Sequence, residues 1–164
     1  MDAKPLHDDF VLLTGGAELF DRVGPLWSEL RRHHADLSPR WSASLLAITF
    51  EQRRADLVGK GTRGLLVCVA TTTTPGGQDI GYCVSTITAE RAGEVDSLYV
   101  IPSQRGCGVG HALMSAALDW FGGQSVGSIV VDVINGNEAA QQFYARYGFL
   151  PRTVRMVRPG GGVA

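Results

Sequence analysis

The first sixty residues carry one short apolar run and two stretches with helical spacing. Residues 10–13 are apolar, end in a glycine pair, and are predicted to form a short strand. The next apolar residues recur every three or four positions, which predicts an amphipathic helix: Leu19, Phe20, Val23, Leu26, Trp27 and Leu30. Because proline removes a helical hydrogen bond, Gly24 and Pro25 are expected to kink or split this helix. A second helix is predicted to follow Pro39 and to end near Leu57.

The middle of the chain changes to the pattern of strands. Residues 65–69, 80–88 and 94–101 are rich in β-branched and aromatic side chains. Turn-forming residues separate them, with Pro-Gly-Gly at 75–77 and Arg-Ala-Gly at 91–93. The three runs are therefore predicted to form an antiparallel meander.

The last part of the chain alternates between helix and strand. One helical face carries the apolar residues that follow a glycine-rich loop: Ala112, Leu113, Ala116, Ala117 and Trp120. Residues 128–134 form a continuous apolar run, which is typical of a strand in the centre of a sheet. A helix is predicted over 137–147, ended by Gly148, and a last strand over 149–157. We expect a disordered tail at 159–164. The order of elements predicts one α+β domain with crossovers in its second half only.

Composition and charge narrow the class of protein. The chain has 164 residues, 45% hydrophobic and 19% charged, which is enough for one folded domain. Fifteen Lys and Arg against sixteen Asp and Glu leave a net charge of −1, which argues against nucleic-acid binding through bulk charge. We see neither a secretory signal pattern nor an apolar run of membrane-spanning length, so the expected location is the cytoplasm and no membrane partner is expected.

The cysteines and histidines give no metal site. Cys68 and Cys83 lie in apolar runs and are predicted to be buried, and no pair of cysteines has the spacing of a zinc site. His33 and His34 are adjacent and would point about 100° apart on a helix. The sequence therefore predicts no metal ion.

Glycine is the most unusual part of the composition, at 21 residues. Three glycines crowd the segment Gln104-Arg105-Gly106-Cys107-Gly108-Val109-Gly110, between a predicted strand and a predicted helix. Such a loop presents backbone N–H groups at the positive end of a helix, where phosphate or pyrophosphate binds, although it could be only a flexible connection. No Lys-Ser/Thr pair follows, as in a P-loop, and the spacing does not match the dinucleotide pattern GxGxxG.

Two blocks of sequence resemble the GCN5-related N-acetyltransferase superfamily. The run Leu98-Tyr99-Val100-Ile101-Pro102 followed by Arg105-x-x-Gly108-x-Gly110 is similar to that family's acyl-CoA motif, Gln/Arg-x-x-Gly-x-Gly/Ala after a strand. The second block is Asn137-x-x-Ala140-x-x-Phe143-Tyr144-Ala145-Arg146-Tyr147-Gly148-Phe149, which is similar to the family's last helix. The two blocks occur in the family's order and cover a third of the chain.

The resemblance implies a fold and a cosubstrate. It implies an acyl-CoA N-acyltransferase domain over residues 1–158, with a mixed, mostly antiparallel sheet of about six or seven strands, about four helices, and a central pair of parallel strands that splay apart. It implies acetyl-CoA bound through backbone amides of the glycine loop, with a backbone N–H near Tyr99 or Val100 polarising the thioester carbonyl. The cofactor-binding residues implied are Leu98, Tyr99, Val100, Gln104, Arg105, Gly106, Cys107, Gly108, Val109, Gly110, His111, Asn137, Ala140 and Phe143.

The resemblance also assigns candidate catalytic residues. Tyr144 matches the position of a tyrosine that protonates the departing CoA thiolate, although an aromatic stripe on a helix is more often part of a core. An amine with a pKa of about 10.4 must also lose a proton before it attacks. Glu94 and Asp96 share one face of a predicted strand and are the candidate bases, and water alone is the alternative.

The acceptor is the least defined part of the prediction. In this superfamily the first two helices build the acceptor pocket. Here they contain the run from Arg31 to His34, which could meet a carboxylate or could be a solvated helical face. The leading expectation is transfer of acetyl to the primary amine of a small molecule. A protein lysine or N-terminus as acceptor, and a non-catalytic acyl-CoA-binding domain, are the alternatives. Homodimers are common in the family, and the sequence leaves the oligomeric state open.

Overall fold

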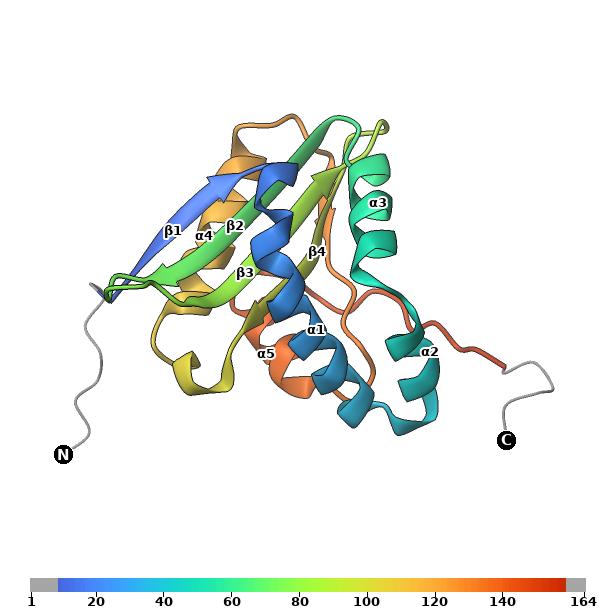
Figure 1. Ribbon diagram of the computed structural model, residues 1–164. Helices are drawn as coiled ribbons and strands as arrows, with labels where there is room; N and C mark the ends of the chain where they lie inside the picture. Colours follow the sequence, from blue (N-terminus) through green and yellow to red (C-terminus); the bar gives the residue numbers. More distant parts are fainter. Residues whose placement is uncertain (1–8, 159–164) are drawn as a thin grey trace.

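A single mixed β-sheet organises the chain. The computed structural model describes residues 9–158, and the predicted tail at 159–164 lies outside them. Within the described part, five strands lie in the order β1-β2-β3-β4-β5 (Figure 1). They are β1 Phe10–Gly15, β2 Gly64–Thr72, β3 Asp79–Ile87, β4 Ala92–Val100 and β5 Ser128–Val130. The first four are antiparallel neighbours, as the predicted meander requires, and β5 runs parallel to β4.

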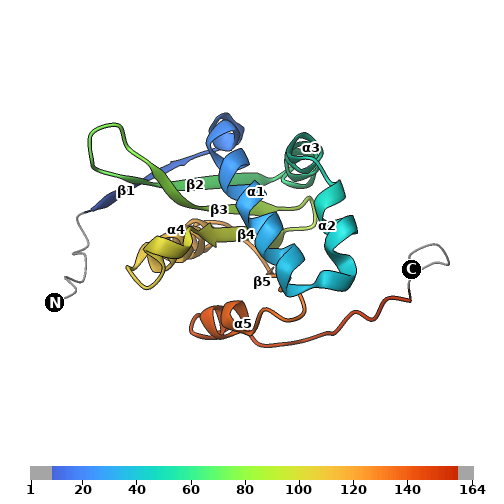
Figure 2. The ribbon, with the colours of Figure 1, turned by 60° about the horizontal axis from the view of Figure 1, so that its bottom comes forward.

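Helices cover both faces of this sheet. They are α1 Phe20–Leu37, α2 Ser42–Ala47, α3 Phe50–Lys60, α4 Val109–Gly122 and α5 Glu138–Ala145. Helix α1 lies on one face and α4 on the other (Figure 2). The alternation along β2 explains this arrangement, because Val67 and Val69 pack in the cluster with α1 while Cys68 and Ala70 pack in the cluster with α4. The predicted burial of Cys68 is confirmed, and Cys83 is buried beside it.

The N-terminal helices differ from the prediction in two ways. The expected split of the first helix does not occur, since α1 continues through Pro25. The carbonyl that Pro25 leaves without a donor belongs to exposed Asp21, where water can reach it. The expected second helix is divided into α2 and α3, because Thr49 begins α3 with a capping box: its Oγ1 accepts from Gln52 N at 3.2 Å and its N donates to Gln52 Oε1 at 2.9 Å.

The strands in the last part of the chain are shorter and fewer than predicted. The run 128–134 forms a strand only over its first three residues, and β5 lies at the edge of the described sheet rather than at its centre. Residues 149–157 are extended but belong to no strand, with Leu150, Val154 and Met156 each more than 80% exposed. Pro151 has no backbone N–H to donate to a neighbouring strand. The segment 131–134, which would be its neighbour, is itself not part of the sheet. The described part of the chain therefore has five strands rather than the predicted six or seven. It has five α-helices rather than the predicted four.

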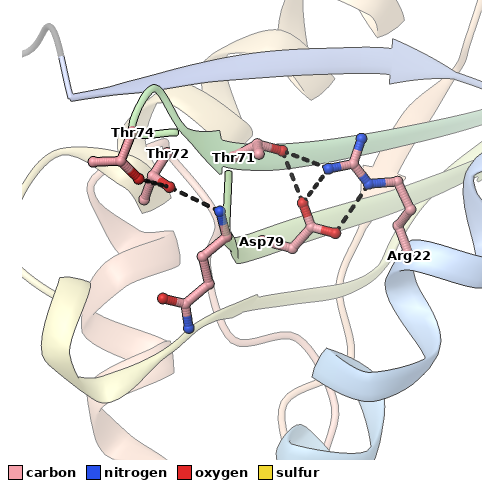
Figure 3. A network of polar contacts seen from close by, with 6 residues as sticks. Arg22, Thr71, Thr72, Thr74 and Asp79 are labelled. Atoms are coloured by element: carbon pink, nitrogen blue, oxygen red, sulfur yellow. Dashed lines mark hydrogen bonds and ion pairs between the residues drawn. The ribbon is translucent and has the colours of Figure 1, made fainter. Parts of the chain in front are cut away.

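A polar network attaches α1 to the β2–β3 hairpin (Figure 3). Arg22 Nε donates to Asp79 Oδ2 at 2.9 Å, and its Nη2 donates to the other carboxylate oxygen and to Thr71 Oγ1. The Thr71 hydroxyl in turn donates to Asp79 Oδ1 at 2.8 Å. This fork fixes the start of α1 against β2 and β3. No helix within residues 9–158 combines the length and the apolar character needed to cross a membrane.

Candidate active site

A cleft of about 950 Å³ enters the sheet between β4 and the segment that follows β5. The two strands pair at only three positions, from Ala92 with Ser128 to Glu94 with Val130. Beyond them, residues 95–100 and 131–134 both line the cleft. The parallel strands therefore splay apart, as expected, although at the edge of the described sheet. Helices α1 and α5 and the glycine loop supply the remaining walls.

A β-bulge at Asp96 sets which side chains of β4 face α1 and α3. The register jumps from Val84 with Ser97 to Ser85 with Val95, so Asp96 is the extra residue. Without the bulge, Ser97 would alternate to the face that α4 covers. With it, Asp96 and Ser97 both lie on the face of α1 and α3.

The glycine loop presents free backbone donors. Gly106 and Gly108 have φ angles of 78° and 88°, a conformation that costs other residues about 1–2 kcal/mol. The N–H groups of residues 106–111 make no hydrogen bond of good geometry within the described part of the chain. They lie at the start of α4, where the helix dipole adds positive charge. This arrangement fits a pyrophosphate.

The side chains around the loop divide into those that line the cleft and those that do not. Arg105 lines it, but its Nε donates to Val100 O at 3.0 Å and its guanidinium lies 5.6 Å from the centre of the Tyr99 ring. His111 Nδ1 lies 2.8 Å from the Tyr147 hydroxyl, and both residues line the cleft. Other predicted cofactor-binding residues on its wall are Leu98, Tyr99, Val100, Gly106, Gly108, Gly110, Asn137, Ala140 and Phe143. Three predicted ones do not line it: Gln104, Cys107 and Val109.

The second motif builds α5 as the opposite wall. Asn137 begins the helix, its Oδ1 accepting from Ala140 N at 3.2 Å. A Cβ added at Gly110 would lie 3.3 Å from the Phe143 ring, so glycine at this position lets α5 approach the loop closely. The glycine at position 110 of the first motif thus has a local structural reason.

Tyr144 lies on α5 at the wall of the cleft, 7% exposed. No described residue hydrogen-bonds to its hydroxyl, and that oxygen is not sealed from solvent as the Tyr82 oxygen is. Burial raises the pKa of Tyr144 well above its usual value. The phenol therefore stays protonated and can donate a proton into the cleft.

The two candidate bases differ in their surroundings. The Asp96 side chain is 0% exposed; its Oδ1 accepts from Lys60 Nζ at 2.7 Å and its Oδ2 from Thr86 Oγ1 at 2.6 Å. Glu94 is 23% exposed and pairs through Oε2 with the same Lys60 Nζ. Burial lowers the pKa of Lys60, but the two carboxylates more than offset this, so the net shift is upward.

Two cations beside the candidate bases were absent from the sequence prediction. Lys60 and Arg53 both come from α3 and contact Asp96, the latter through Nη2 to Asp96 O at 3.1 Å. Neither lies near a recognisable motif, and only the fold places α3 beside β4. Arg31 also reaches the cleft, from the run that could equally have been a solvated face. Within residues 9–158, no group of three His, Cys, Asp or Glu residues is arranged to hold a metal ion.

Comparison with known families agrees with this geometry. The sequence model of the Acetyltransferase (GNAT) family matches residues 27–149. The chain belongs to the GNAT acetyltransferase family. A search of the functionally curated proteins finds no match.

Solved structures of GNAT proteins share the fold over nearly the whole chain. A mutant of the BH1408 protein from Bacillus halodurans has a TM-score of 0.70 at 18% identity, covering 91% of this chain and 98% of that one. The aminoglycoside N-acetyltransferase AAC(6')-Iy in complex with CoA has a TM-score of 0.65 at 16% identity, covering 96% and 98%. The ribosomal-protein-alanine N-acetyltransferase from Brucella melitensis biovar Abortus 2308 has a TM-score of 0.64 at 18% identity, covering 92% and 99%. At these identities the likeness concerns the fold alone.

Proposed function

We propose that this GNAT protein transfers the acetyl group of acetyl-CoA directly to the primary amine of a small molecule. The observation that carries the proposal is the splayed strand pair, with unpaired amides of residues 106–111 at one end and the Tyr144 hydroxyl on the facing wall. Acetyl-CoA supplies the activated acyl group as a thioester. The pyrophosphate would be held by the loop amides, and the acyl arm would lie between β4 and residues 131–134.

In this proposal the acceptor amine attacks the thioester carbon from the side of α1 and α3. A C–N bond forms, the C–S bond breaks, and the thiolate takes the proton of the Tyr144 hydroxyl. A backbone N–H of β4 near Tyr99 would polarise the carbonyl, since this part of β4 has a partner strand on one side only. The amine loses its proton to a base in the cleft.

Glu94 is better suited than Asp96 to accept that proton. Both oxygens of Asp96 are occupied by donors and its side chain is enclosed. Glu94 has one oxygen without a partner among the described residues and reaches the cleft. We therefore assign Glu94 as the base, directly or through water, and Asp96 as the residue that positions Lys60.

A small acceptor is supported by where the polar groups of the acceptor wall lie. Arg31 and Ser97 line the cleft, and their Nε, Nη2 and Oγ atoms are shielded from solvent rather than spread over an exposed surface. AAC(6')-Iy and the ribosomal-protein-alanine N-acetyltransferase share this fold, so the fold alone does not select the acceptor. The cytoplasmic location and a homodimer remain predictions.

Replacement of Tyr144 by phenylalanine tests the proposal. Release of free CoA thiol with an amine acceptor should fall roughly 10- to 100-fold, the low end for a general acid because a thiolate leaves readily. Acetyl-CoA affinity, measured by the rise in melting temperature, should be unchanged. Tyr147→Phe removes a second phenol from the wall of the cleft, the one beside His111, and should lower turnover far less than Tyr144→Phe. Full turnover in Tyr144→Phe would remove the assignment, and no thermal shift with millimolar acetyl-CoA would remove the proposed function.

A further inference from the structure

The guanidinium of Arg31 lies in the acceptor side of the cleft without a partner. Its Nε and Nη2 are both shielded from solvent, and neither makes a hydrogen bond within residues 9–158. Its carbon atom Cζ lies 5.2 Å from the centre of the Trp27 ring, which orients the guanidinium plane. A buried donor without an acceptor costs free energy that a ligand would recover. Arginine stays charged even there, so the missing partner is an anion.

No carboxylate of the described residues pairs with Arg31. Glu94 and Asp96, which line the same cleft, both pair with Lys60, and Asp96 also pairs with Arg53. Arg53 is close enough to lower the pKa of Arg31, together with the larger effect of burial. Arg31 therefore keeps a positive charge without a counter-ion, which a carboxylate can supply.

Two hydroxyl groups of the neighbouring strands are also unsatisfied. Ser97 Oγ and Tyr82 Oη are buried and have no hydrogen-bond partner of good geometry among the described residues. Burial raises the pKa of Tyr82, and a weak hydrogen bond with the Ser97 hydroxyl and the charges of Arg53 and Arg31 offset part of that rise. The bulge at Asp96 brings Ser97 to this face. The four buried donor atoms come from α1, β3 and β4, and two of the three residues, Arg31 and Ser97, line the cleft.

We propose that Arg31 and Ser97, backed by Tyr82, bind a carboxylate of the acceptor, so that the substrate is an amino acid rather than a simple amine. The inference rests on the proposed function, because it names the acceptor of the same cleft. Ser97 lies two residues before Tyr99, or about 7 Å along the strand. The carboxylate and the reacting amine of the substrate are therefore separated by a short chain of atoms, as in α-, β- and γ-amino acids or lysine.

Matched pairs of acceptors test the substrate class. Each pair differs only in the carboxylate: β-alanine and ethylamine, γ-aminobutyrate and propylamine, lysine and cadaverine, phenylalanine and phenethylamine. In at least one pair the amino acid should have a kcat/KM roughly 10- to 100-fold above that of its amine, as expected for hydrogen bonds to a charged group. Amines equal to or better than their amino acids in every pair would overturn the proposal.

Variants of Arg31 test the residue itself. Arg31→Met keeps the stem over Trp27 and should raise KM for the amino acid with little change in kcat, while kinetics with the matching amine stay unchanged. Arg31→Lys retains the charge but not the fork and should recover part of the loss. Arg32→Met, on the exposed side of the same helix, is the control. An equal effect of Arg31→Met on both members of a pair would contradict a carboxylate site.

A binding measurement separates this inference from the proposed function. Calorimetric titration of the protein–CoA complex with the same amino acids should give binding that Arg31→Met weakens by the same factor. Binding that Arg31→Met leaves unchanged, or no binding of any of these carboxylates, would overturn the carboxylate site even if amines are acetylated. Failure of acetyl-CoA itself to bind would instead remove the proposed function.

Discussion

Replacing Asp96 by asparagine separates structural from chemical roles in the cleft. Asp96 is fully enclosed and accepts from Lys60 and Thr86. Removing one member of a buried ion pair costs about 3–5 kcal/mol. Lys60 and Arg53 are 30% and 28% exposed, and Glu94 remains to pair with Lys60, so we expect a smaller loss of about 2–3 kcal/mol. In a domain of this size that loss lowers the melting temperature by about 5–10 °C.

The assay compares thermal unfolding with turnover measured well below both melting temperatures. Asp96→Asn should lose stability and keep most of its kcat, with an unchanged pH profile. Glu94→Gln is the matched variant: its side chain is partly exposed, so it should lose only about 1 kcal/mol but should be slow at neutral pH. A stable Asp96→Asn protein without activity, beside an active Glu94→Gln protein, would refute this division and make Asp96 the base.

Three further outcomes follow from other parts of the molecule. Gly108→Ala forces a side chain into a φ of 88° and should weaken acetyl-CoA binding measured by thermal shift, whereas Gly122→Ala, at the far end of α4 with no atom near its new Cβ, should not. Burial, aided by the charges of His33 and Arg31, lowers the pKa of His34 from 6.5 to about 4, so the folded state keeps this side chain neutral. As the pH drops from 6.5 to about 4, the stability of the wild type to urea should therefore fall by more than the stability of His34→Gln. Equal pH dependence of the two proteins would contradict this. Asp79→Asn should break the network with Arg22 and cost about 1 kcal/mol without changing kcat, because neither residue lines the cleft.

The sequence alone predicted the elements whose patterns are local. The meander and the helix after the glycine loop follow from apolar periodicity and turn residues, and the structure confirms them. The split into α2 and α3 was not predicted, although Thr49 and Gln52 have the spacing of a capping box and could have indicated it. The short β5 was not, because an apolar run carries no information on where two strands diverge.

The candidate site also has a part that local sequence patterns predict and a part that they do not. The donor side rests on contiguous motifs and was predicted residue by residue. The acceptor side depends on contacts between distant segments, such as Lys60 with Asp96, and on a bulge that shifts Ser97 to the other face of β4. Strict alternation along a strand predicts the wrong face for Ser97, and no periodic pattern marks the extra residue.

The bulge at Asp96 also constrains how this protein could be redesigned. Its carboxylate is bound by Lys60, the last residue of α3, so the register of β4 depends on a helix of the acceptor wall. Exchanging α1–α3 for those of a relative, to change the acceptor, would also exchange the group that holds the bulge in place. A transplant that keeps Lys60 should preserve the position of Ser97, whereas one without it should alter β4 next to the proposed thioester site as well as the proposed acceptor pocket.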